Sequence, residues 1–261
     1  MSETRDSATL PAQPRLVLLS GPSCVGKSPL LKALRKFYPE LAARLHPLVL
    51  YNDRDPRPGE QSGREYYFRP REFIEALRDE PGYLVLPVRR DLQALEIAQV
   101  RRILDGGAWP FFEGNPYVAK ALMEAEELAD VPRVSCYLSP LSREEILFLR
   151  SQPHADLEKI VADVMRRKLL RRTQRQKGLL GAEDLADIEA RCQAAFSELY
   201  FAPAFHWVLP NHDGEDSENW EAFYYPLGDA RKALVDFAAI LAGEEPRWAE
   251  RWDESVLPAR A

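Results

Sequence analysis

One stretch of eight residues constrains the fold of this chain more than any other. The segment "GPSCVGKS" (21–28) follows the apolar run "RLVLLS" (15–20) and precedes "SPLLKALRKFY" (28–38), in which leucines recur at helical spacing. The order strand, glycine loop, helix is the start of a β–α–β unit. The segment also fits the pattern G-x-x-x-x-G-K-S/T in the context that this pattern requires. We therefore expect an α/β fold with a phosphate-binding loop at this position.

The residue types of this loop predict how it would bind a nucleoside triphosphate. Glycines let backbone N–H groups point inward at phosphate oxygens, and the following helix adds the positive end of its dipole. We expect Lys27 to bridge the β- and γ-phosphates of ATP and the Ser28 hydroxyl to ligate Mg²⁺. The alternative, a chance match, does not account for the flanking strand and helix. The ATP-binding residues are thus expected to include Gly21, Pro22, Ser23, Cys24, Val25, Gly26, Lys27 and Ser28.

The rest of the chain alternates apolar strands with amphipathic helices. We expect strands at 46–52, 82–88, 108–115, 133–139 and 205–211. Helices are expected at 69–80, 92–107, 117–129, 142–152, 156–177, 182–200 and 229–243. This alternation favours a P-loop core with a mainly parallel sheet flanked by helices. A single domain would cover 15–242, with peripheral tails at 1–14 and 244–261.

Composition argues against several classes of function. The formal charge of −6 disfavours a general binder of nucleic acids or anionic membranes. No apolar run approaches the roughly 20 residues that span a bilayer, and the polar N-terminus lacks the apolar core of a secretory signal. The three cysteines form neither a paired framework nor a metal cluster. We expect a cytoplasmic protein that binds small nucleotides, and its oligomeric state is left unknown.

A second polar stretch, "YNDRDPRPGEQSGREYYF" (51–68), contains three arginines and no lysine. Arginine is preferred over lysine at phosphates because its planar fork meets them with two parallel hydrogen bonds. A solvated, charged turn is the alternative reading of this stretch taken alone. Beside an intact phosphate loop, a phosphate-binding role is favoured.

Together, the two motifs resemble guanylate kinase. That family reads S-G-P-S-G-x-G-K-S/T at the phosphate loop, and "SGPSCVGKS" departs from it only at Cys24. The family then carries T-T-R-x-x-R-x-G-E-x-x-G-x-x-Y-x-F, and the resemblance extends over roughly residues 15–242. Of this second motif the chain keeps Arg54, Arg57, Gly59, Glu60, Gly63, Tyr66 and Phe68.

The resemblance implies a phosphotransferase that moves the γ-phosphoryl group of ATP to GMP with Mg²⁺. It implies an acceptor-binding insertion at about 50–90 and a helical lid at about 142–180. By position, Arg54, Arg57 and Tyr66 would grip the acceptor phosphate. Glu60 would orient those arginines or the lid, and Glu113 would lie near the metal and acceptor. Asn211 matches the residue beside the donor adenine. The lid would supply two arginines, one of them Arg143 or Arg150 and the other Arg166 or Arg167. We expect Lys27, Arg150 and Arg166 to be the catalytic residues.

The chain departs from the family where guanine is read. The upstream serine that touches the base aligns with Leu50, and the glutamate that pairs with the guanine edge aligns with Leu84 or Val85. The following Y-G-T/S aligns with "QAL" (93–95). Loss of such buried partners weakens guanine binding by about one to several kcal/mol, where about 1.4 kcal/mol is tenfold in affinity. We expect the acceptor to be GMP or another phosphate monoester.

Two other functions stay open at this point. One is a phospho-ligand binding module without kinase turnover; members of that type usually have a degraded phosphate loop. The other is an NTPase with a different acceptor. We expect the basic segment 165–177 to be a solvated lid helix, and we expect the acids at 213–218 to form a solvated loop.

Overall fold

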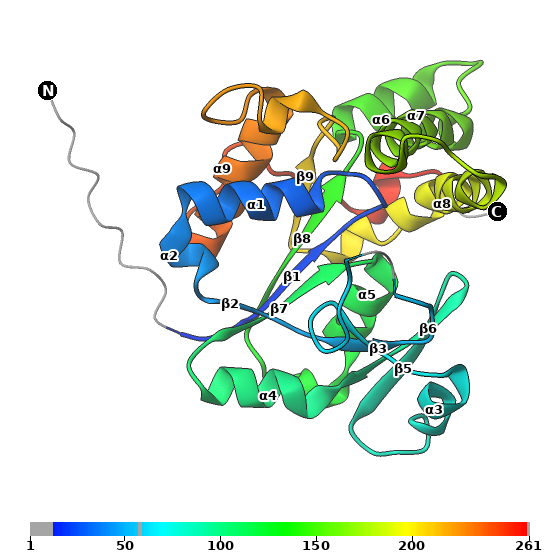
Figure 1. Cartoon of the computed structure of the whole chain (residues 1–261). Coiled ribbons are helices and arrows are strands. Elements are labelled where there is room, and N and C mark those ends of the chain that lie inside the picture. The colour runs from blue at the N-terminus through cyan, green and yellow to red at the C-terminus, as the bar shows by residue number, and fades with distance from the viewer. Residues whose placement is uncertain (1–12, 57–58, 260–261) are drawn as a thin grey trace, which may run out of the picture. The chain divides into compact units, whose positions relative to one another are not determined.

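The computed structural model of this chain describes residues 13–56 and 59–259 (Figure 1). It divides into two compact units. Unit 1 contains residues 19–43 and the chain from Ser135 onward, and unit 2 contains residues 14–18 and 44–134. Within the described part of the chain, none of the helices combines the length and the hydrophobicity needed to cross a membrane.

The first β-sheet has five strands in the order β2–β7–β1–β8–β9, and its pairs β2–β7 and β8–β9 are parallel. All five residues of β1 are buried, as expected for a strand covered on both faces of a sheet. The parallel pairing and the flanking helices confirm the predicted α/β class. The strands are β1 (Leu16–Ser20), β2 (Leu45–Pro47), β7 (Trp109–Gly114), β8 (Arg133–Ser139) and β9 (Trp207–Pro210).

The second sheet lies within unit 2 and has the order β4–β3–β6–β5. Strand β3 pairs in parallel with β4, whereas the pairs β3–β6 and β5–β6 are antiparallel. One face packs against helix α3 (Arg71–Ala76) through a small core of Ile74, Leu77, Leu92 and Ala94. The strands are β3 (Leu50–Asn52), β4 (Tyr66–Phe68), β5 (Tyr83–Val88) and β6 (Asp91–Glu96).

Helix α7 (Leu157–Lys177) begins and ends at residues that suit those positions. Asp156 accepts a hydrogen bond from the backbone N–H of Lys159 and caps helix α7, which ends before Gly178. In unit 1, α7 and α8 lie side by side (Figure 1). Unit 1 has α1 (Lys27–Phe37), α2 (Pro39–Ala42), α6 (Arg143–Ser151), α7 (Leu157–Lys177), α8 (Ala182–Leu199), α9 (Gly228–Ala242) and the 3₁₀ helices Ala202–Ala204, Glu218–Trp220 and Glu254–Val256. Unit 2 adds α4 (Ile97–Asp105), α5 (Pro116–Glu124) and the 3₁₀ helix Glu126–Leu128.

The helix predicted at 92–107 is wrong in its first part, because residues Asp91–Glu96 form strand β6. This strand pairs along its whole length with β5, from Tyr83 opposite Glu96 to Val88 opposite Asp91. Leu92 and Leu95 are both buried although they lie on opposite faces of the strand. Their spacing of three imitates a helical stripe, so the pattern of apolar residues misled the prediction.

The strand predicted at 46–52 is also wrong as a single element, because it divides into β2 and β3 in two different sheets. Leu48 and Val49 lie between them, outside both strands. The side-chain amide of Gln99 accepts a hydrogen bond of 2.7 Å from the N–H of Val49 and donates one of 3.2 Å to its carbonyl oxygen. A side chain distant in sequence thus satisfies the backbone at the break.

Candidate functional site

The phosphate loop lies in unit 1 between β1 and α1, and two glycines fix its shape. Gly21 has φ 141° and Gly26 has φ 106°, values that side chains rarely allow. A Cβ atom at Gly21 would lie 2.4 Å from the carbonyl oxygen of Leu138, and one at Gly26 would lie 2.5 Å from Nδ2 of Asn211. Both positions therefore require glycine, and the backbone can curl as an anion-binding loop does.

Lys27, the first residue of α1, has its ammonium group held inside this loop. The side chain is only 7% exposed, and Nζ donates hydrogen bonds to the carbonyl oxygens of Gly21 (3.0 Å) and Pro22 (2.8 Å). An ammonium group has three N–H donors, so these two bonds leave one for a phosphate oxygen. The Ser28 hydroxyl follows in the first turn of α1, at an exposed position.

Cys24 stands at the turn of the loop where the related motif has glycine. Its φ of 65° is left-handed, which explains why glycine suits this position. The thiol is buried, and burial together with the nearby Glu215 carboxylate raises the pKa of Cys24. A protonated, buried thiol is a poor nucleophile, so the structure gives Cys24 a packing role.

Asn211 braces the loop from the end of β9. It is fully buried, and Nδ2 donates to the carbonyl oxygens of Val25 (2.7 Å) and Asp213 (2.8 Å). Its Oδ1 accepts the N–H of Asp213 at 3.1 Å. Both amide hydrogens are therefore used within the protein. A role beside the donor adenine stays a prediction for this residue.

The acids that follow Asn211 are not the solvated loop that the sequence suggests. We call residues 213–218 the acidic segment. It lies against the phosphate loop, because a Cβ at Gly214 would be 2.3 Å from the carbonyl oxygen of Cys24. Asp216 is 7% exposed, and Trp220 anchors the segment by donating from Nε1 to the carbonyl oxygens of Asp213 (2.9 Å) and Gly214 (3.0 Å). Burial of acids requires cations nearby, and helix α7 supplies them.

Four cations of α7 meet the acidic segment. Lys168 is 8% exposed and donates a hydrogen bond to the carbonyl oxygen of His212. Burial lowers the pKa of its ammonium group, and the charges of nearby acids, Asp216 foremost, oppose that shift. The other contacts are Arg171 to Asp216 at 3.6 Å, Arg172 to Glu215 at 3.6 Å and Arg175 to the carbonyl oxygen of Asp216 at 2.6 Å. The basic helix is thus partly neutralised beside the phosphate loop rather than solvated on all faces.

Lys168 and Arg172 are the cations that the sequence reasoning missed. Both lie close enough to Cys24 for their charges to influence its thiol. A signal for them does exist in the sequence. Val161, Met165 and Leu169 belong to the buried stripe of α7, Lys168 lies buried among them, and the half-buried Arg172 follows one turn later. A charged residue on the apolar face of a helix needs a buried partner, which marks it for attention.

The two arginines selected as catalytic have other partners in this structure. Arg150 donates to the backbone carbonyl oxygens of Ser255 and Val256, near the C-terminus. Arg166 donates two hydrogen bonds of 2.9 Å to Glu189 on α8 and also binds Asp163. The hydrogen bonds that Arg166 donates to Glu189 raise the pKa of its guanidinium group. Their proposed catalytic role would require both side chains to exchange these partners.

Unit 2 contains the predicted acceptor-phosphate residues, and Arg54 and Glu60 form a close pair. Nη1 and Nη2 of Arg54 each donate a 2.7 Å hydrogen bond to a different carboxylate oxygen of Glu60. The guanidinium carbon lies 5.2 Å from the ring centre of Tyr66 and 5.4 Å from that of Phe68. Burial alone would lower the pKa of Arg54, but the pair with Glu60 raises it. The structure thus brings together Arg54, Glu60 and Tyr66.

Two other predicted acceptor residues are less informative. Arg57 lies outside the described residues. Glu113 is half-buried near the end of strand β7 and has polar interactions of its own. Its role near a metal and an acceptor remains a prediction.

In the second sheet, strand pairing shows which side chains lie on the face that packs against α3 and which lie on the opposite face. Val85 packs with Tyr51, Leu92 and Ala94 on the α3 side of the sheet. Because side chains alternate along a strand, Leu84 lies on the opposite face and pairs directly with Leu95. Leu84, not Val85, is thus the residue that shares a face with Leu50. Where the related motif has a serine, a glutamate and a Ser/Thr, this chain presents Leu50, Leu84 and Leu95.

Two buried amides interrupt this aliphatic face. Asn52 and Gln93 are paired across β3 and β6, and they are 1% and 5% exposed. Asn52 accepts the backbone N–H of Arg54 at 3.1 Å, while its Nδ2 has no hydrogen-bond partner among the described residues. Gln93 accepts a long bond of 3.5 Å from Asn115. This face therefore offers amide groups but no carboxylate from the positions named above.

Comparison with known proteins gives one consistent result. The sequence profile of the family described as guanylate kinase matches residues 13–91. The guanylate kinase of Streptomyces coelicolor (strain ATCC BAA-471 / A3(2) / M145) is 30% identical over 205 residues, which cover 78% of this chain and 87% of that protein. That of Synechococcus sp. (strain JA-3-3Ab) is 29% identical over 213 residues, covering 81% and 82%.

A solved structure supports the same fold. The crystal structure of guanylate kinase from Anaplasma phagocytophilum superposes with a TM-score of 0.54 and covers 91% of this chain and 89% of its own. The sequence identity is 18%, so this likeness concerns the fold alone.

Proposed function

This chain belongs to the guanylate kinase family, and we propose that it transfers the γ-phosphoryl group of ATP to a nucleoside monophosphate whose base is not held by a carboxylate. It is a nucleoside monophosphate kinase. The observation that carries the proposal is that the chain has both a phosphate loop with its lysine in place, in unit 1, and an intact arginine–glutamate pair, in unit 2. A cytoplasmic location remains a prediction.

On the donor side, we assign the triphosphate to the phosphate loop of unit 1. Backbone N–H groups and the start of α1 would hold the phosphate oxygens, and Lys27 would neutralise their charge. Lys168 and Arg172 are further cations close to this loop. Phosphoryl transfer depends mostly on positioning and on neutralising charge, so cations beside the loop are what the reaction needs.

Mg²⁺ fits the donor atoms that the loop offers. No group of three or more acidic, histidine or cysteine side chains that could hold a metal occurs in residues 13–56 and 59–259. Mg²⁺ needs no such group in a kinase, since it is bound largely by substrate phosphates and water. The exposed Ser28 hydroxyl at the start of α1 would supply one ligand. The ion would neutralise charge on the phosphates.

On the acceptor side, we assign the phosphate of the monophosphate to Arg54 and Tyr66, with Glu60 fixing the orientation of Arg54. Charge-assisted hydrogen bonds from a guanidinium fork give both strength and direction. An ionised phosphate oxygen is already nucleophilic, so the transfer needs no side chain to remove a proton. Arg57 would join this group by its place in the family motif.

The aliphatic side chains of Leu50, Leu84 and Leu95 decide the expected base preference. A guanine edge presents N–H donors, and a site without a carboxylate acceptor leaves them unpaired. The cost is about 1–3 kcal/mol, or roughly 5- to 150-fold in kcat/KM. We therefore infer a relaxed or altered base preference, with GMP as one substrate among several.

Release of ADP, measured by a coupled assay with each nucleoside monophosphate in turn, tests this function. We expect turnover that depends on Mg²⁺ and on an added monophosphate, with kcat/KM values that vary little between GMP and other bases. Lys27→Ala should abolish turnover. ADP release without an added acceptor would instead indicate an NTPase, and binding of monophosphates without any turnover would indicate a binding module. Strong selectivity for GMP would refute the inference about the base while leaving the kinase assignment intact.

A further inference from the structure

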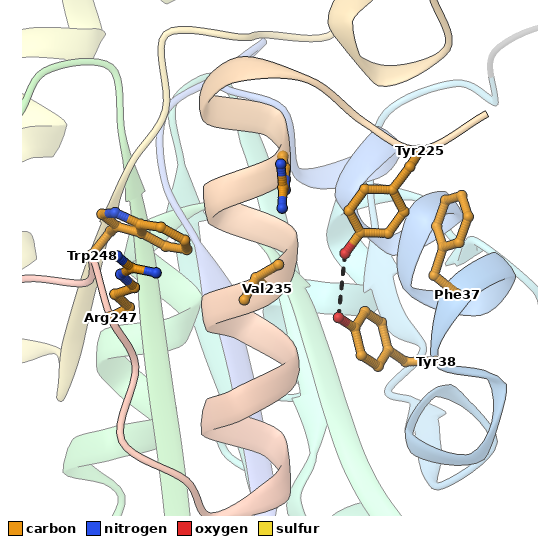
Figure 2. Close-up of a pocket in the computed structure, with 7 residues that line it drawn as sticks. Phe37, Tyr38, Tyr225, Val235, Arg247 and Trp248 are labelled. Carbon is orange, nitrogen blue, oxygen red and sulfur yellow. Dashed lines mark hydrogen bonds between the residues drawn. The ribbon is translucent and has the colours of Figure 1, made fainter. Parts of the chain in front are cut away.

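A cavity in unit 1 lies along helix α9 and is lined by none of the residues assigned above. Its volume is about 480 Å³, within the range of roughly 300–1,000 Å³ typical of small-ligand sites. Val235 of α9 lies between two walls (Figure 2). One wall is formed by Phe37 and Tyr38 at the end of α1 with Tyr225, and the other by Arg247 and Trp248, which follow α9.

The first wall is a set of packed aromatic rings. The rings of Phe37 and Tyr225 meet edge to face, with centres 4.7 Å apart. The hydroxyl groups of Tyr38 and Tyr225 are 3.3 Å apart and point toward each other (Figure 2). Packed rings lose little conformational freedom when a ligand binds, so this wall is prepared to receive a flat molecule.

The second wall is held in place by a buried carboxylate. Asp236 is 1% exposed and accepts the backbone N–H groups of Arg247 (2.9 Å) and Trp248 (2.8 Å). Burial raises the pKa of Asp236, and these backbone hydrogen bonds oppose that shift. Since Asp236 belongs to α9, these hydrogen bonds fix the backbone of Arg247 and Trp248 against that helix. Trp248 as a whole is 36% exposed, so it is open to a ligand.

Two arginines give the cavity a positive character. The guanidinium carbon of Arg247 lies 4.9 Å from the Trp248 ring centre, and that of Arg231 lies 5.8 Å from the Tyr225 ring centre. Within the described residues, neither guanidinium has a carboxylate at ion-pair distance, unlike those of Arg54 and Arg166. A guanidinium over the face of a ring is attracted to it without using its N–H donors, so an anion can still bind them.

We propose that this cavity is a second ligand site that binds a nucleotide, with its base against the aromatic walls and its phosphate attracted by Arg231 and Arg247. Aromatic walls together with unpaired guanidinium groups match a ligand that is flat at one end and anionic at the other. The cavity size suits one such molecule rather than a length of peptide or nucleic acid.

The test is a titration of the full chain in a Lys27→Ala/Arg54→Ala background, which disables the donor and acceptor sites. AMP and GMP are the probes, with adenosine and inorganic phosphate as the two halves of the ligand, and tryptophan fluorescence or calorimetry reports binding. We expect AMP and GMP to bind this double variant at least about ten times more tightly than adenosine or inorganic phosphate does. Trp248→Phe should reduce the fluorescence change that accompanies binding.

Adding Arg231→Gln and Arg247→Gln should weaken nucleotide binding by about tenfold or more. Arg251→Gln is the matched control, because Arg251 also stacks on an indole, that of Trp207 at 4.3 Å, outside the cavity; it should change affinity by less than about twofold. Arg231 and Arg247 are exposed, so unchanged thermal unfolding should show that the variants are folded. The proposal is overturned if nucleotide binding disappears in the Lys27→Ala/Arg54→Ala background, if it is unaffected by the two glutamines, or if inorganic phosphate binds as tightly as AMP.

Discussion

The carboxylate of Glu60 accepts both parallel hydrogen bonds of the Arg54 guanidinium, each 2.7 Å long, in a pair whose side chains are 15% and 18% exposed. Because the pair is largely shielded from water, its geometry is held more firmly than that of a surface ion pair. Glu60 thus fixes the direction of the Arg54 guanidinium. In the acceptor site proposed above, Glu60 would therefore act as a positioning residue that does not itself touch the phosphate.

We expect Glu60→Gln to raise the KM for the nucleoside monophosphate about tenfold, because the neutral amide orients the guanidinium less firmly. The KM for ATP should stay unchanged. Steady-state kinetics with each substrate varied in turn measures both constants. Glu65→Gln is the control, since Glu65 lies in the same segment and pairs with the exposed Arg64 instead. An equal rise in both KM values would argue against the assignment of this pair to the acceptor.

A second prediction concerns space at the phosphate loop. Gly26→Ala should lower the free energy of unfolding by more than about 2 kcal/mol, because left-handed strain adds to the clash with Asn211 and Asp213. Gly82→Ala is the matched control: its φ of 86° is also left-handed, but a Cβ there meets nothing within 4 Å. Urea unfolding of both variants separates strain from clash. Equal losses would show that the close approach to Asn211 carries no cost.

A third prediction follows from the acidic segment. Glu215→Gln removes the carboxylate that faces Arg172 and should tighten ATP binding by about two- to tenfold, because the cation is released for the phosphates. The gain should shrink as salt is added. Calorimetric titration of ATP at two salt concentrations measures it. Weaker ATP binding in Glu215→Gln would show instead that the acid supports the site.

Much of the phosphate loop could be predicted because its chemistry is local. Glycine positions, the lysine and the start of α1 follow one another along the chain, and short-range rules describe them. The boundaries of β1, α7 and α9 were also close to their predicted positions, since each has a long apolar pattern and a clear end.

Contacts between distant segments could not be predicted in the same way. The acids at 213–218 look solvated until α7 is placed beside them, some 40 residues away along the chain. Leu84 and Val85 are equivalent in sequence, and only the pairing of β5 with β6 decides which one faces α3. Strand β6 resembled a helix because it is buried on both faces. Each of these features depends on tertiary partners rather than on local pattern.

A fourth prediction concerns pH. The hydrogen bonds with Arg166 lower the pKa of Glu189 below its ordinary value of 4.5. The ion pair therefore stabilises the fold fully above that pH, and this stabilisation is lost as the pH falls through the lower pKa that Glu189 has in the folded state. Both side chains are about a third or more exposed, so water screens the pair and the gain is about 0.5 kcal/mol. Glu189→Gln should therefore be slightly less stable than the parent at about pH 7 and equal to it at about pH 3. Thermal unfolding across this range checks the sign; a difference that persists at low pH would mean that packing, not charge, is responsible.

The last prediction places a carboxylate at the position proposed to face the acceptor base. Leu84→Glu should raise kcat/KM for GMP about tenfold relative to AMP, because a carboxylate can accept the N–H groups of guanine. Leu84 is half-buried, so the new charge can remain partly hydrated. Val85→Glu is the matched control: the residue is adjacent, but it packs on the α3 side with Leu92 and Ala94, so it should lower stability without improving GMP. Competition between GMP and AMP in one reaction measures the ratio directly. If both glutamates leave it unchanged, the face of β5 opposite α3 does not contact the base.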